Sequence, residues 1–495
     1  MSSLTTDTDV LIVGAGPVGL FLANECARRG LRYRLIEENS SQSEHSKALA
    51  IFPRTLEIFD MAGLVGPFLE RANRVTSVAV VTHERTLAHM RFAPQESPYS
   101  FVAMVPQDVT EKLLVEGLRR KGGDVEYQTK FVSADQQEDC VSVTLDHKGE
   151  PINLRASFVV GCDGAHSAVR HQLNLPFEGA QYKDLFLLAD VETNETLPAD
   201  ELQLCPNELG PVAIFPMSAN RRRVVATIDN TEGDAPSLDL VRQILAQRAP
   251  SGIEALGLHW GTYFRIHHRQ AAELRVGCTF IAGDAAHIHS PFGGQGMNTG
   301  LHDIWNLVWK LDLVLHGRGN EELLKSYSAE RRPVIKHVIE TTDFLTKAMG
   351  TPSKLAQLLR DAIIPMVSRL APFQHAFVQR LSELGVAYRG SPIVEGAGER
   401  YFDDSMRGGD AIRSRFLLFV DGDADSSTKQ AAKQLAESMT NIVELRLRPR
   451  HEITLVRPDG YIAYSDHSRD EIAALTSVRS LLERQTKSEG GRRAA

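Results

Sequence analysis

The chain has 495 residues, 42% of them hydrophobic and 24% charged, a composition typical of a globular protein with room for two or three domains. Its 63 acidic residues outnumber its 55 basic ones, and the net charge of −8 argues against nucleic acid as a partner. The five cysteines form no Cys-x-x-Cys pair, which argues against a metal cluster and is typical of a reducing compartment. The N-terminal region shows neither a secretory signal nor an apolar run long enough to span a membrane, so we expect a cytoplasmic protein.

The most informative stretch near the start combines a buried strand with a glycine-rich turn. Residues 10–13 are apolar and predict a parallel strand, after which Gly14, Gly16 and Gly19 lead into a helix. In a dinucleotide site, such glycines permit a tight turn, close approach of a pyrophosphate and packing of helix on strand. The helix N-terminus offers free N–H groups to the anion. We expect five residues to contact a dinucleotide: Gly14, Gly16, Pro17, Val18 and Gly19.

An acidic residue ends the next predicted strand. Gly30 is placed to end the first helix, and residues 33–36 predict a second strand. Glu37 follows at about the spacing of a carboxylate that binds a ribose diol, and an acid there disfavours a 2′-phosphate. Lys47, in the polar loop beyond, is predicted to contact a phosphate, with a solvated lysine as the alternative.

A second motif follows another buried strand at residues 158–170. The strand ends at Asp163 in an Asp-Gly turn, and Ser167 and Arg170 then enter a short helix. An acid at the carboxyl end of a parallel strand is well placed for a ligand hydroxyl. The alternative is that Asp163 only caps the next helix.

Residues from about 180 to 270 show short alternating runs with polar turns, which predict an antiparallel sheet. Such a sheet, inserted between parts of a nucleotide-binding fold, would form a second wall of a pocket. Four side chains are candidates to face that pocket, with ordinary sheet packing as the alternative: Phe215, Met217, Tyr263 and Arg265. The run Arg221–Arg223 is predicted to be a solvated turn, with contact to a nicotinamide phosphate as the alternative.

The third motif indicates which dinucleotide is bound. Residues 279–282 predict a strand that ends at Asp284, and a glycine-rich turn at 293–296 precedes a helix that includes Leu301. Two such turns suit a ligand with two anionic regions, and a helix N-terminus stabilises the negative charge of a reduced flavin ring. Asp284 would then bind the ribityl hydroxyls. The histidines within residues 287–289 are not expected to hold a metal, because no further ligand cluster accompanies them.

The part of the chain after residue 320 divides into helices, a linker and a small α/β unit. Helical patterns dominate residues 323–385, and a Gly-rich linker is predicted over 396–409. Strands and helices then alternate, with a Pro-Asp-Gly turn at 458–460.

Together the three motifs resemble those of the single-component FAD-dependent aromatic hydroxylases, a family that includes phenol, hydroxyphenylpropionate and aromatic polyketide hydroxylases. The resemblance depends on Gly-Ala-Gly-Pro-Val-Gly at 14–19, Asp-Gly-x-x-Ser-x-Val-Arg at 163–170, and two runs within 283–299, Gly-Asp-Ala-Ala-His and Pro-x-Gly-Gly-Gln-Gly-Met-Asn-Thr. It covers roughly residues 5–395.

The resemblance implies an α/β fold with three domains. They are a Rossmann-type FAD-binding domain at 1–180 and 270–390, an inserted antiparallel-sheet substrate domain at 181–269 to which residues 75–104 contribute, and a thioredoxin-like domain at 400–486. Because the last of these contains no Cys-x-x-Cys, we expect it to have a structural role or to support a homodimer.

The resemblance also implies roles for individual residues. Glu37 would bind the adenosine ribose and Asp284 the ribityl chain, while the other cofactor contacts would be Lys47, Gln107, Asp163, Gly294, Gly296, Met297 and Asn298. The family usually has Arg where this chain has Lys47, which keeps the charge but loses the bidentate fork. Pro291 and Phe292 would lie beside the reacting edge of the flavin and the substrate, and Arg265 or His267 could stabilise a phenolate.

The implied reaction is hydroxylation of a phenolic or polyketide-like ring through a flavin hydroperoxide, with NADPH or NADH as a transient co-substrate and dioxygen as the oxidant. Two alternatives remain open: a flavin reductase or oxidase without oxygen insertion, and a non-catalytic flavoprotein scaffold. A flavin halogenase is disfavoured because its Trp-x-Trp-x-Ile-Pro signature is absent from the sequence.

Overall fold

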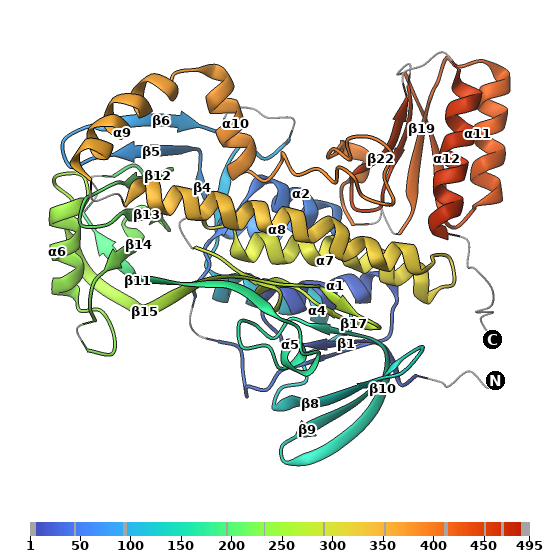
Figure 1. Cartoon of the computed structure of the whole chain (residues 1–495), viewed down its shortest axis with the longest axis horizontal. Coiled ribbons are helices and arrows are strands. Elements are labelled where there is room, and N and C mark those ends of the chain that lie inside the picture. The colour runs from blue at the N-terminus through green and yellow to red at the C-terminus, as the bar shows by residue number, and fades with distance from the viewer. Residues whose placement is uncertain are drawn as a thin grey trace.

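The computed structural model describes residues 6–43, 46–92, 97–194, 197–231, 233–290, 293–350, 353–409, 414–449, 452–466 and 470–486. Within these residues the chain forms a mixed α/β fold with two large sheets and a smaller C-terminal unit (Figure 1). None of the helices described is both long and apolar enough to cross a membrane.

The first sheet carries the three sequence motifs. It has seven strands, with a main path β16-β17-β10-β1-β2 that β9 and β8 extend. Its strands are β1 (Thr8–Val13), β2 (Tyr33–Ile36), β8 (Thr129–Gln136), β9 (Val141–His147), β10 (Glu150–Gly161), β16 (Arg275–Val276) and β17 (Thr279–Ile281). β1 pairs in parallel with β2 and β10, and β10 pairs in parallel with β17. The carboxyl ends of β1, β10 and β17 therefore meet at one edge, and each leads into one motif.

Helices cover this sheet and complete its core. The helix α1 (Pro17–Arg29) packs against α4 (Gln107–Arg120) and α7 (Gly296–Leu315), and Trp305 lies in the shared core. Gly30 ends α1 with φ +72°, which confirms its predicted role as a left-handed helix stop. Shorter helices near the sheet are α2 (Pro53–Met61), α3 (Val65–Arg71), α5 (Ala168–Gln172) and the 3-10 turn η1 (Gly283–Ala285).

The second sheet has eight strands in the order β18-β15-β11-β14-β13-β12-β5-β6. They are β5 (Ser77–Val81), β6 (Thr86–Arg91), β11 (Phe177–Thr193), β12 (Glu201–Cys205), β13 (Val212–Pro216), β14 (Arg221–Ile228), β15 (Ala255–Ala271) and β18 (His287–Ile288). All neighbours pair antiparallel except β12 and β5, which are parallel. Of the stretch 75–104, which the resemblance implied would contribute to this sheet, residues 77–91 join it, whereas residues 102–104 belong to a separate three-stranded sheet.

Both faces of the second sheet are covered. On one face α6 (Leu238–Arg248) packs against Leu187 and Val224. The other face, which includes Phe186 and Phe215, packs against a three-stranded sheet of β3 (Ala50–Ile51), β7 (Val102–Met104) and β4 (Asn73–Val75). Two further helices cover this end, α9 (Lys354–Val367) and α10 (Ala371–Leu381), which lie over β5 and β6 (Figure 1). The long helix α8 (Glu321–Met349) runs from this end along α7 to the C-terminal unit.

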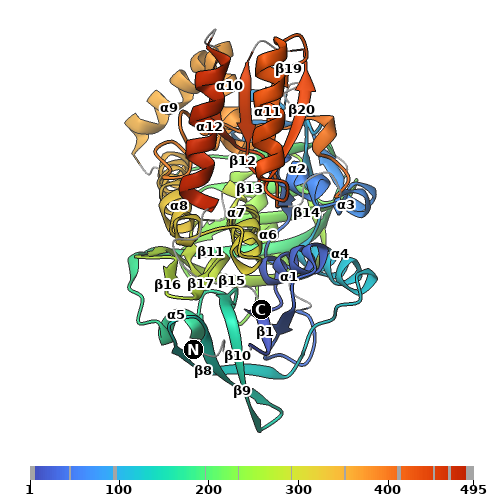
Figure 2. The same cartoon turned by 90° about the vertical axis from the view of Figure 1, so that its right-hand side faces the viewer.

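The C-terminal unit is a four-stranded sheet with two helices on one face, seen toward the viewer in Figure 2. Its elements are β19 (Phe416–Asp421), α11 (Ser426–Ser438), β20 (Val443–Arg448), β21 (Ile453–Val456), β22 (Ile462–Asp466) and α12 (Glu471–Thr486). The order is β20-β19-β21-β22, in which β19 and β20 are parallel and the other pairs antiparallel. Its core is continuous with Trp309 of α7 and Leu323 of α8.

The turn between β21 and β22 inserts into the rest of the molecule. Arg457 and Asp459 are fully or almost fully buried there and pair with each other, Nη2 to Oδ2 at 2.6 Å. Arg457 also donates to Glu330 of α8 at 2.9 Å, and the same carboxylate accepts from Lys310 of α7 at 2.8 Å. Burial alone would raise the pKa of Glu330, but Arg457 and Lys310 outweigh it and hold that pKa well below its usual range.

The predicted linker over 396–409 is a packed segment rather than a free one. Arg28 of α1 donates to the carbonyl of Gly409 at 2.7 Å. Gly63 and Gly409 approach so closely that a Cβ on Gly409 would lie 3.0 Å from the Cα of Gly63. The C-terminal unit is therefore joined to the first sheet by packed backbone as well as by the inserted turn.

Candidate cofactor and substrate site

The glycines of the first motif have three different surroundings. Gly14 has φ +99°, and a Cβ there would lie 2.5 Å from the carbonyl oxygen of Cys162. A Cβ at Gly19 would lie 1.9 Å from the carbonyl oxygen of Gly14, so both positions exclude any side chain. A Cβ at Gly16 would meet nothing within 4 Å. The backbone at the N-terminus of α1 therefore faces open space, which fits the phosphates of a dinucleotide.

Glu37 is bonded to the first motif at the end of β2. Its Oε2 accepts from the N–H of Ala15 at 2.9 Å. Its Oε1 accepts from the backbone N–H of Asn39 at 3.0 Å and from the side-chain amide of Asn39 at 2.6 Å. Glu37 thus holds the glycine turn and the following loop in one arrangement while remaining half-exposed.

Asp284, in contrast, accepts no hydrogen bond from any described residue. Its side chain is exposed, yet desolvation raises its pKa, with partial opposition from His287 and Lys47. The carboxylate therefore lines a recess in the protein rather than the outer surface. The exposed side chain of Lys47 lies near enough to influence it, so these two charges face a common space. A free carboxylate in such a recess suits the hydroxyls of a ribityl chain.

The three motifs are in direct contact with one another. Cβ atoms added at Gly283 and Gly300 would lie 2.9 and 2.7 Å from Cγ2 of Val18, so all three positions pack tightly. Arg170 of the second motif donates to the carbonyl of Ala285 at 2.9 Å. The guanidinium of Arg170 also lies 4.0 Å above the ring of Phe177, which makes it a structural residue between the first two sheets.

Asp163 is already bonded by the helix that follows it. Its carboxylate accepts from the Ser167 hydroxyl at 2.6 Å and from the Val169 N–H at 3.1 Å. Burial raises its pKa, and these hydrogen bonds lower it by less. The hydrogen bonds correspond to the alternative interpretation of the sequence, in which Asp163 caps the turn into α5.

Two polar side chains hold the loop that carries Lys47. The amide oxygen of Gln107 accepts from the Ala48 N–H at 3.1 Å, and its amide nitrogen donates to Glu111 at 2.9 Å. Arg223 donates to the carbonyls of Lys47 and Ala48, each at 3.1 Å. Gln107 therefore acts on the loop beside the cofactor recess.

The solvated turn predicted at Arg221–Arg223 is wrong. Arg222 and Arg223 are 1% and 2% exposed, and all three residues belong to β14. Arg223 forms a bidentate pair with Asp190, at 2.7 and 2.9 Å, which is what permits its burial. No local pattern indicates this pairing, because Asp190 lies on a different strand.

The N-terminus of α7 is hydrogen-bonded to the backbone of β3 and of the residue that follows it. The buried amide of Asn298 donates to the carbonyl of Ala50 and accepts from the N–H of Phe52, both at 2.9 Å. Gly294 has φ +63°, and a Cβ there would lie 3.6 Å from Cβ of Ala50. The side chain of Asn298 is thus bonded to backbone groups. The backbone N–H groups of Gly296, Met297 and Asn298 lie in the first turn of α7, where an intrahelical partner is lacking and an anionic ligand can accept from them.

His289 lies beside this helix start with one ring nitrogen unpaired. Burial, helped by the nearby His287, lowers its pKa to about 4. Nδ1 lies 3.1 Å from the Ser290 carbonyl, whereas Nε2 is buried without a hydrogen-bond partner among the described residues. A Cβ at Gly296 would lie 3.7 Å from that Nε2. An orphaned polar atom beside a helix start fits a site built for a polar ligand.

An apolar cavity extends from this point between the second sheet and α10. It encloses about 580 Å³ of empty space, part of which is open to solvent. Gly293 forms one part of its lining, beside the third motif. The rest of the described lining comes from β3, β4, β5, β7, β12 and β13, from the C-terminal end of α8, from α10, and from Phe52 before α2 and Phe92 after β6.

The four predicted pocket residues lie on two different faces of the second sheet. Phe215 lines the cavity, and Met217 packs against the same hydrophobic cluster. Tyr263 is wrong as a pocket residue, because it pairs with Leu187 and packs on the α6 face. Arg265 is wrong for the same reason, since it pairs with Leu185 of that face and is exposed.

Three predicted residues lie outside the description. Pro291 and Phe292 fall between the described segments, and the side chain of His267 is likewise not described. Among the described residues, no group of three or more His, Cys, Asp or Glu could hold a metal ion. Nε2 of His287 pairs instead with Asp303 at 2.7 Å.

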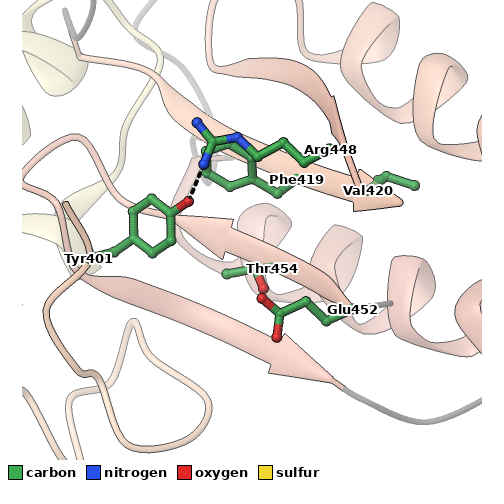
Figure 3. A pocket seen from close by; sticks show the side chains of 6 residues that line it. All are labelled: Tyr401, Phe419, Val420, Arg448, Glu452 and Thr454. Atoms are coloured by element: carbon green, nitrogen blue, oxygen red, sulfur yellow. Dashed lines mark hydrogen bonds between the residues drawn. The ribbon is translucent and has the colours of Figure 1, made fainter. Parts of the chain in front are cut away.

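A smaller hollow lies in the C-terminal unit and contains none of the motif residues (Figure 3). Tyr401 and Arg448 border it and are hydrogen-bonded to each other at 2.6 Å. Arg448 also forms an ion pair with Asp403 at 2.5 Å, so its charge is neutralised within the unit. This hollow is separate from the cofactor recess.

Comparison with known proteins agrees with this geometry. The family described as "FAD binding domain" matches residues 7–342. Rifampicin monooxygenase of Streptomyces venezuelae is 31% identical over 478 residues, covering 94% of this chain and 97% of that protein. The 6-methylpretetramide 4-monooxygenase of Streptomyces rimosus is 33% identical over 401 residues, covering 79% and 72%. The solved structure of OxyS anhydrotetracycline hydroxylase from Streptomyces rimosus has a TM-score of 0.78 and 27% identity, covering 97% and 99%.

The chain therefore belongs to the family of flavoproteins with this FAD binding domain. Within that family it is an enzyme, an FAD-dependent aromatic hydroxylase of the single-component class, as the three motifs indicated.

Proposed function

We propose that this enzyme uses NADPH or NADH and dioxygen to hydroxylate a phenolic or polyketide-like aromatic ring. One oxygen atom would enter the ring as a hydroxyl group and the other would leave as water, with two electrons supplied by the nicotinamide. The observation that carries the proposal is the apolar cavity that meets the third motif at Gly293. A ring held in that cavity would lie next to the flavin-binding end of α7.

The residues present fit FAD. Gly16 would leave room for the pyrophosphate, Glu37 would bind the adenosine ribose, and Asp284, whose carboxylate accepts no hydrogen bond from the described residues, would bind the ribityl chain. The N–H groups at the start of α7 would stabilise negative charge on the flavin ring. When bound, FAD supplies the hydride acceptor and the activation of dioxygen. The apolar wall would keep water away from the reacting ring.

The relatives support the substrate class. Their names refer to rifampicin and to tetracycline-type polyketides. An aromatic ring of a related kind is the substrate that we propose for this chain. Arg265 is not proposed to bind a phenolate, because it pairs with Leu185 of the α6 face, and no described side chain is proposed as the base.

The test is nicotinamide oxidation by the FAD-loaded protein with and without a panel of phenols, followed by mass spectrometry of the product formed under ¹⁸O₂. Substrate-stimulated oxidation with one ¹⁸O atom in the product is the expected result. Oxidation without incorporation would favour a reductase or oxidase, and bound FAD without any turnover would favour a scaffold. Either result would overturn the proposal.

We further propose that residues 400–486 form a thioredoxin-like domain with a structural role in a cytoplasmic protein. The parallel pair β19–β20 and the antiparallel hairpin β21–β22 support this. All five cysteines are buried and free, and none lies in this unit: Cys26, Cys140, Cys162, Cys205 and Cys278. A role in dithiol chemistry is therefore not proposed.

A further inference from the structure

The imidazole of His289 has one bonded ring nitrogen and one that is buried without a partner among the described residues. Nδ1 lies 3.1 Å from the carbonyl oxygen of Ser290, and a carbonyl oxygen only accepts, so the ring proton is on Nδ1. Burial, together with the neighbouring histidine, lowers the pKa of the ring to about 4, which keeps it neutral at pH 7. Nε2 therefore has a lone pair and is a hydrogen-bond acceptor that lacks a donor.

The neighbouring side chains hold this ring but do not supply the missing donor. The Ser290 hydroxyl is hydrogen-bonded to that of Thr346 at 2.9 Å, which holds Ser290 against α8. The ring of His287 stacks beside that of His289 with centroids 6.4 Å apart, and its Nε2 is bonded to Asp303 at 2.7 Å. Nδ1 of His287 is also unpartnered, so the two rings are not bonded to each other. A donor for Nε2 of His289 therefore has to come from a ligand or from a water molecule.

Backbone donors lie next to this acceptor, at the start of α7. The N–H groups of residues 296–298 precede the first helical hydrogen bond, which runs from Thr299 to the carbonyl of Gln295 at 2.9 Å. The side chain of Gln295, the N-cap residue, does not cap them. A Cβ on Gly296 would lie 3.7 Å from Nε2 of His289. Several N–H donors and one acceptor thus share a single location.

This combination matches the pyrimidine edge of an oxidised flavin ring. That edge carries two accepting carbonyls, C2=O and C4=O, on either side of N3–H, the single N–H donor of the ring. The N–H groups of α7 suit C2=O, because they also stabilise the negative charge that reduction places on this part of the ring. The adjacent N3–H suits an acceptor. An ionised phosphate or carboxylate would use the same backbone donors but would leave Nε2 of His289 unpaired.

We infer that the pyrimidine edge of the flavin lies at the start of α7 and that its N3–H donates to Nε2 of His289. His289 is then a cofactor-contacting residue in addition to those that the three motifs predicted. The inference rests on the proposed function only in taking FAD to be the cofactor held by the third motif. It does not depend on oxygen transfer or on the identity of the substrate.

The test is a thermodynamic cycle between one atom of the protein and one atom of the ligand. FAD and N3-methyl-FAD, which lacks the N3–H, are titrated at pH 7 into apoprotein of the parent chain and of His289→Leu, and flavin fluorescence gives each dissociation constant. Methylation is expected to raise the dissociation constant about tenfold in the parent protein and about twofold or less in the variant. Loss of the Nδ1 bond to Ser290 affects both cofactors alike and cancels in the cycle.

The ratio of the two methylation effects decides the outcome. A ratio of about fivefold or more supports the inference, and a smaller ratio overturns it, as expected if a water molecule pairs with Nε2 instead. Equal affinities of the parent protein for FAD and N3-methyl-FAD would overturn it without any variant. Since every readout is binding, a failure to hydroxylate counts only against the proposed function.

Two further variants secure the measurement. His259→Leu, at an exposed histidine of β15, is the matched control and should show the same methylation effect as the parent protein. If His289→Leu does not fold, His289→Phe replaces it in the cycle, because it keeps a flat ring beside His287 and removes both ring nitrogens.

Discussion

Two carboxylates of the cofactor site differ in what they already bind. Glu37 accepts hydrogen bonds from Ala15 and Asn39, so part of its contribution is to the shape of the glycine turn. Asp284 accepts none from the described residues and faces the recess near Lys47. Replacement of Asp284 should therefore weaken the binding of FAD rather than lower the stability of the protein.

Asp284→Ala is expected to raise the dissociation constant of FAD by about tenfold to a hundredfold, since hydrogen bonds to a charged group contribute about 1.5–3 kcal/mol. Flavin fluorescence during titration of the apoprotein measures this constant. Asp239→Ala, at a highly exposed carboxylate of α6, is the control. An unchanged dissociation constant for Asp284→Ala would show that the third motif does not hold the ribityl chain.

At the level of elements, the side chain of Asn298 hydrogen-bonds the start of α7 to the backbone at Ala50 and Phe52, which line the cavity. Asn298→Ala would leave the buried N–H of Phe52 and the carbonyl of Ala50 without partners. We expect the free energy of unfolding to fall by about 2–4 kcal/mol, because each orphaned group costs about 1–3 kcal/mol. Urea unfolding of the variant beside Asn153→Ala, an exposed asparagine, measures the difference. A fall equal to that of the control would contradict the role given to Asn298.

The elements of the first sheet could be predicted more closely than those of the second. Gly14 and Gly30 have positive φ angles, which favour glycine. The strand, the turn and the helix end could therefore be predicted from the sequence. The second sheet is buried on both faces, and its strands are apolar on both sides. The alternation of apolar and polar residues therefore does not indicate which face of the sheet borders the cavity. For this reason the prediction for Tyr263 is wrong, since its side chain lies on the α6 face.

For the whole molecule, the inserted turn is one of the connections between the C-terminal unit and the cofactor-binding part. Arg457→Met would remove the cation that pairs with buried Asp459, and it would leave buried Glu330 with Lys310 as the remaining one of its two cations. The free energy of unfolding is expected to fall by about 3–5 kcal/mol, the usual cost of breaking a buried ion pair from one side. Scanning calorimetry measures this, with Arg479→Met on the surface of α12 as the control.

The effect of Arg457→Met should depend on pH. The pKa of Glu330 in the folded protein is held below its ordinary value of 4.5, so its ion pairs stabilise the fold above about pH 4.5. As the pH falls below that value, the difference between the variant and the parent protein should shrink. A difference that does not change with pH would show that lost packing, and not lost charge, is responsible.

The sequence predicted a turn at 458–460 but not its insertion. Charged residues in a Pro-Asp-Gly turn are normally solvated, and burial of Arg457 depends on Glu330, which lies 127 residues earlier. Likewise, Asp459 accepts from Arg54 of α2 at 2.9 Å and from Trp305 at 3.0 Å through its backbone carbonyl. No local pattern encodes contacts of such separation.

The inserted turn also sets an order of events during translation. Glu330 and Lys310 leave the ribosome well before Arg457 is made, because synthesis proceeds from the N-terminus. Until then the nascent cofactor-binding region has an incomplete charge network at the surface that will receive the turn. Its final packing must wait for the last quarter of the chain, and in that interval its exposed apolar surface is available to chaperones.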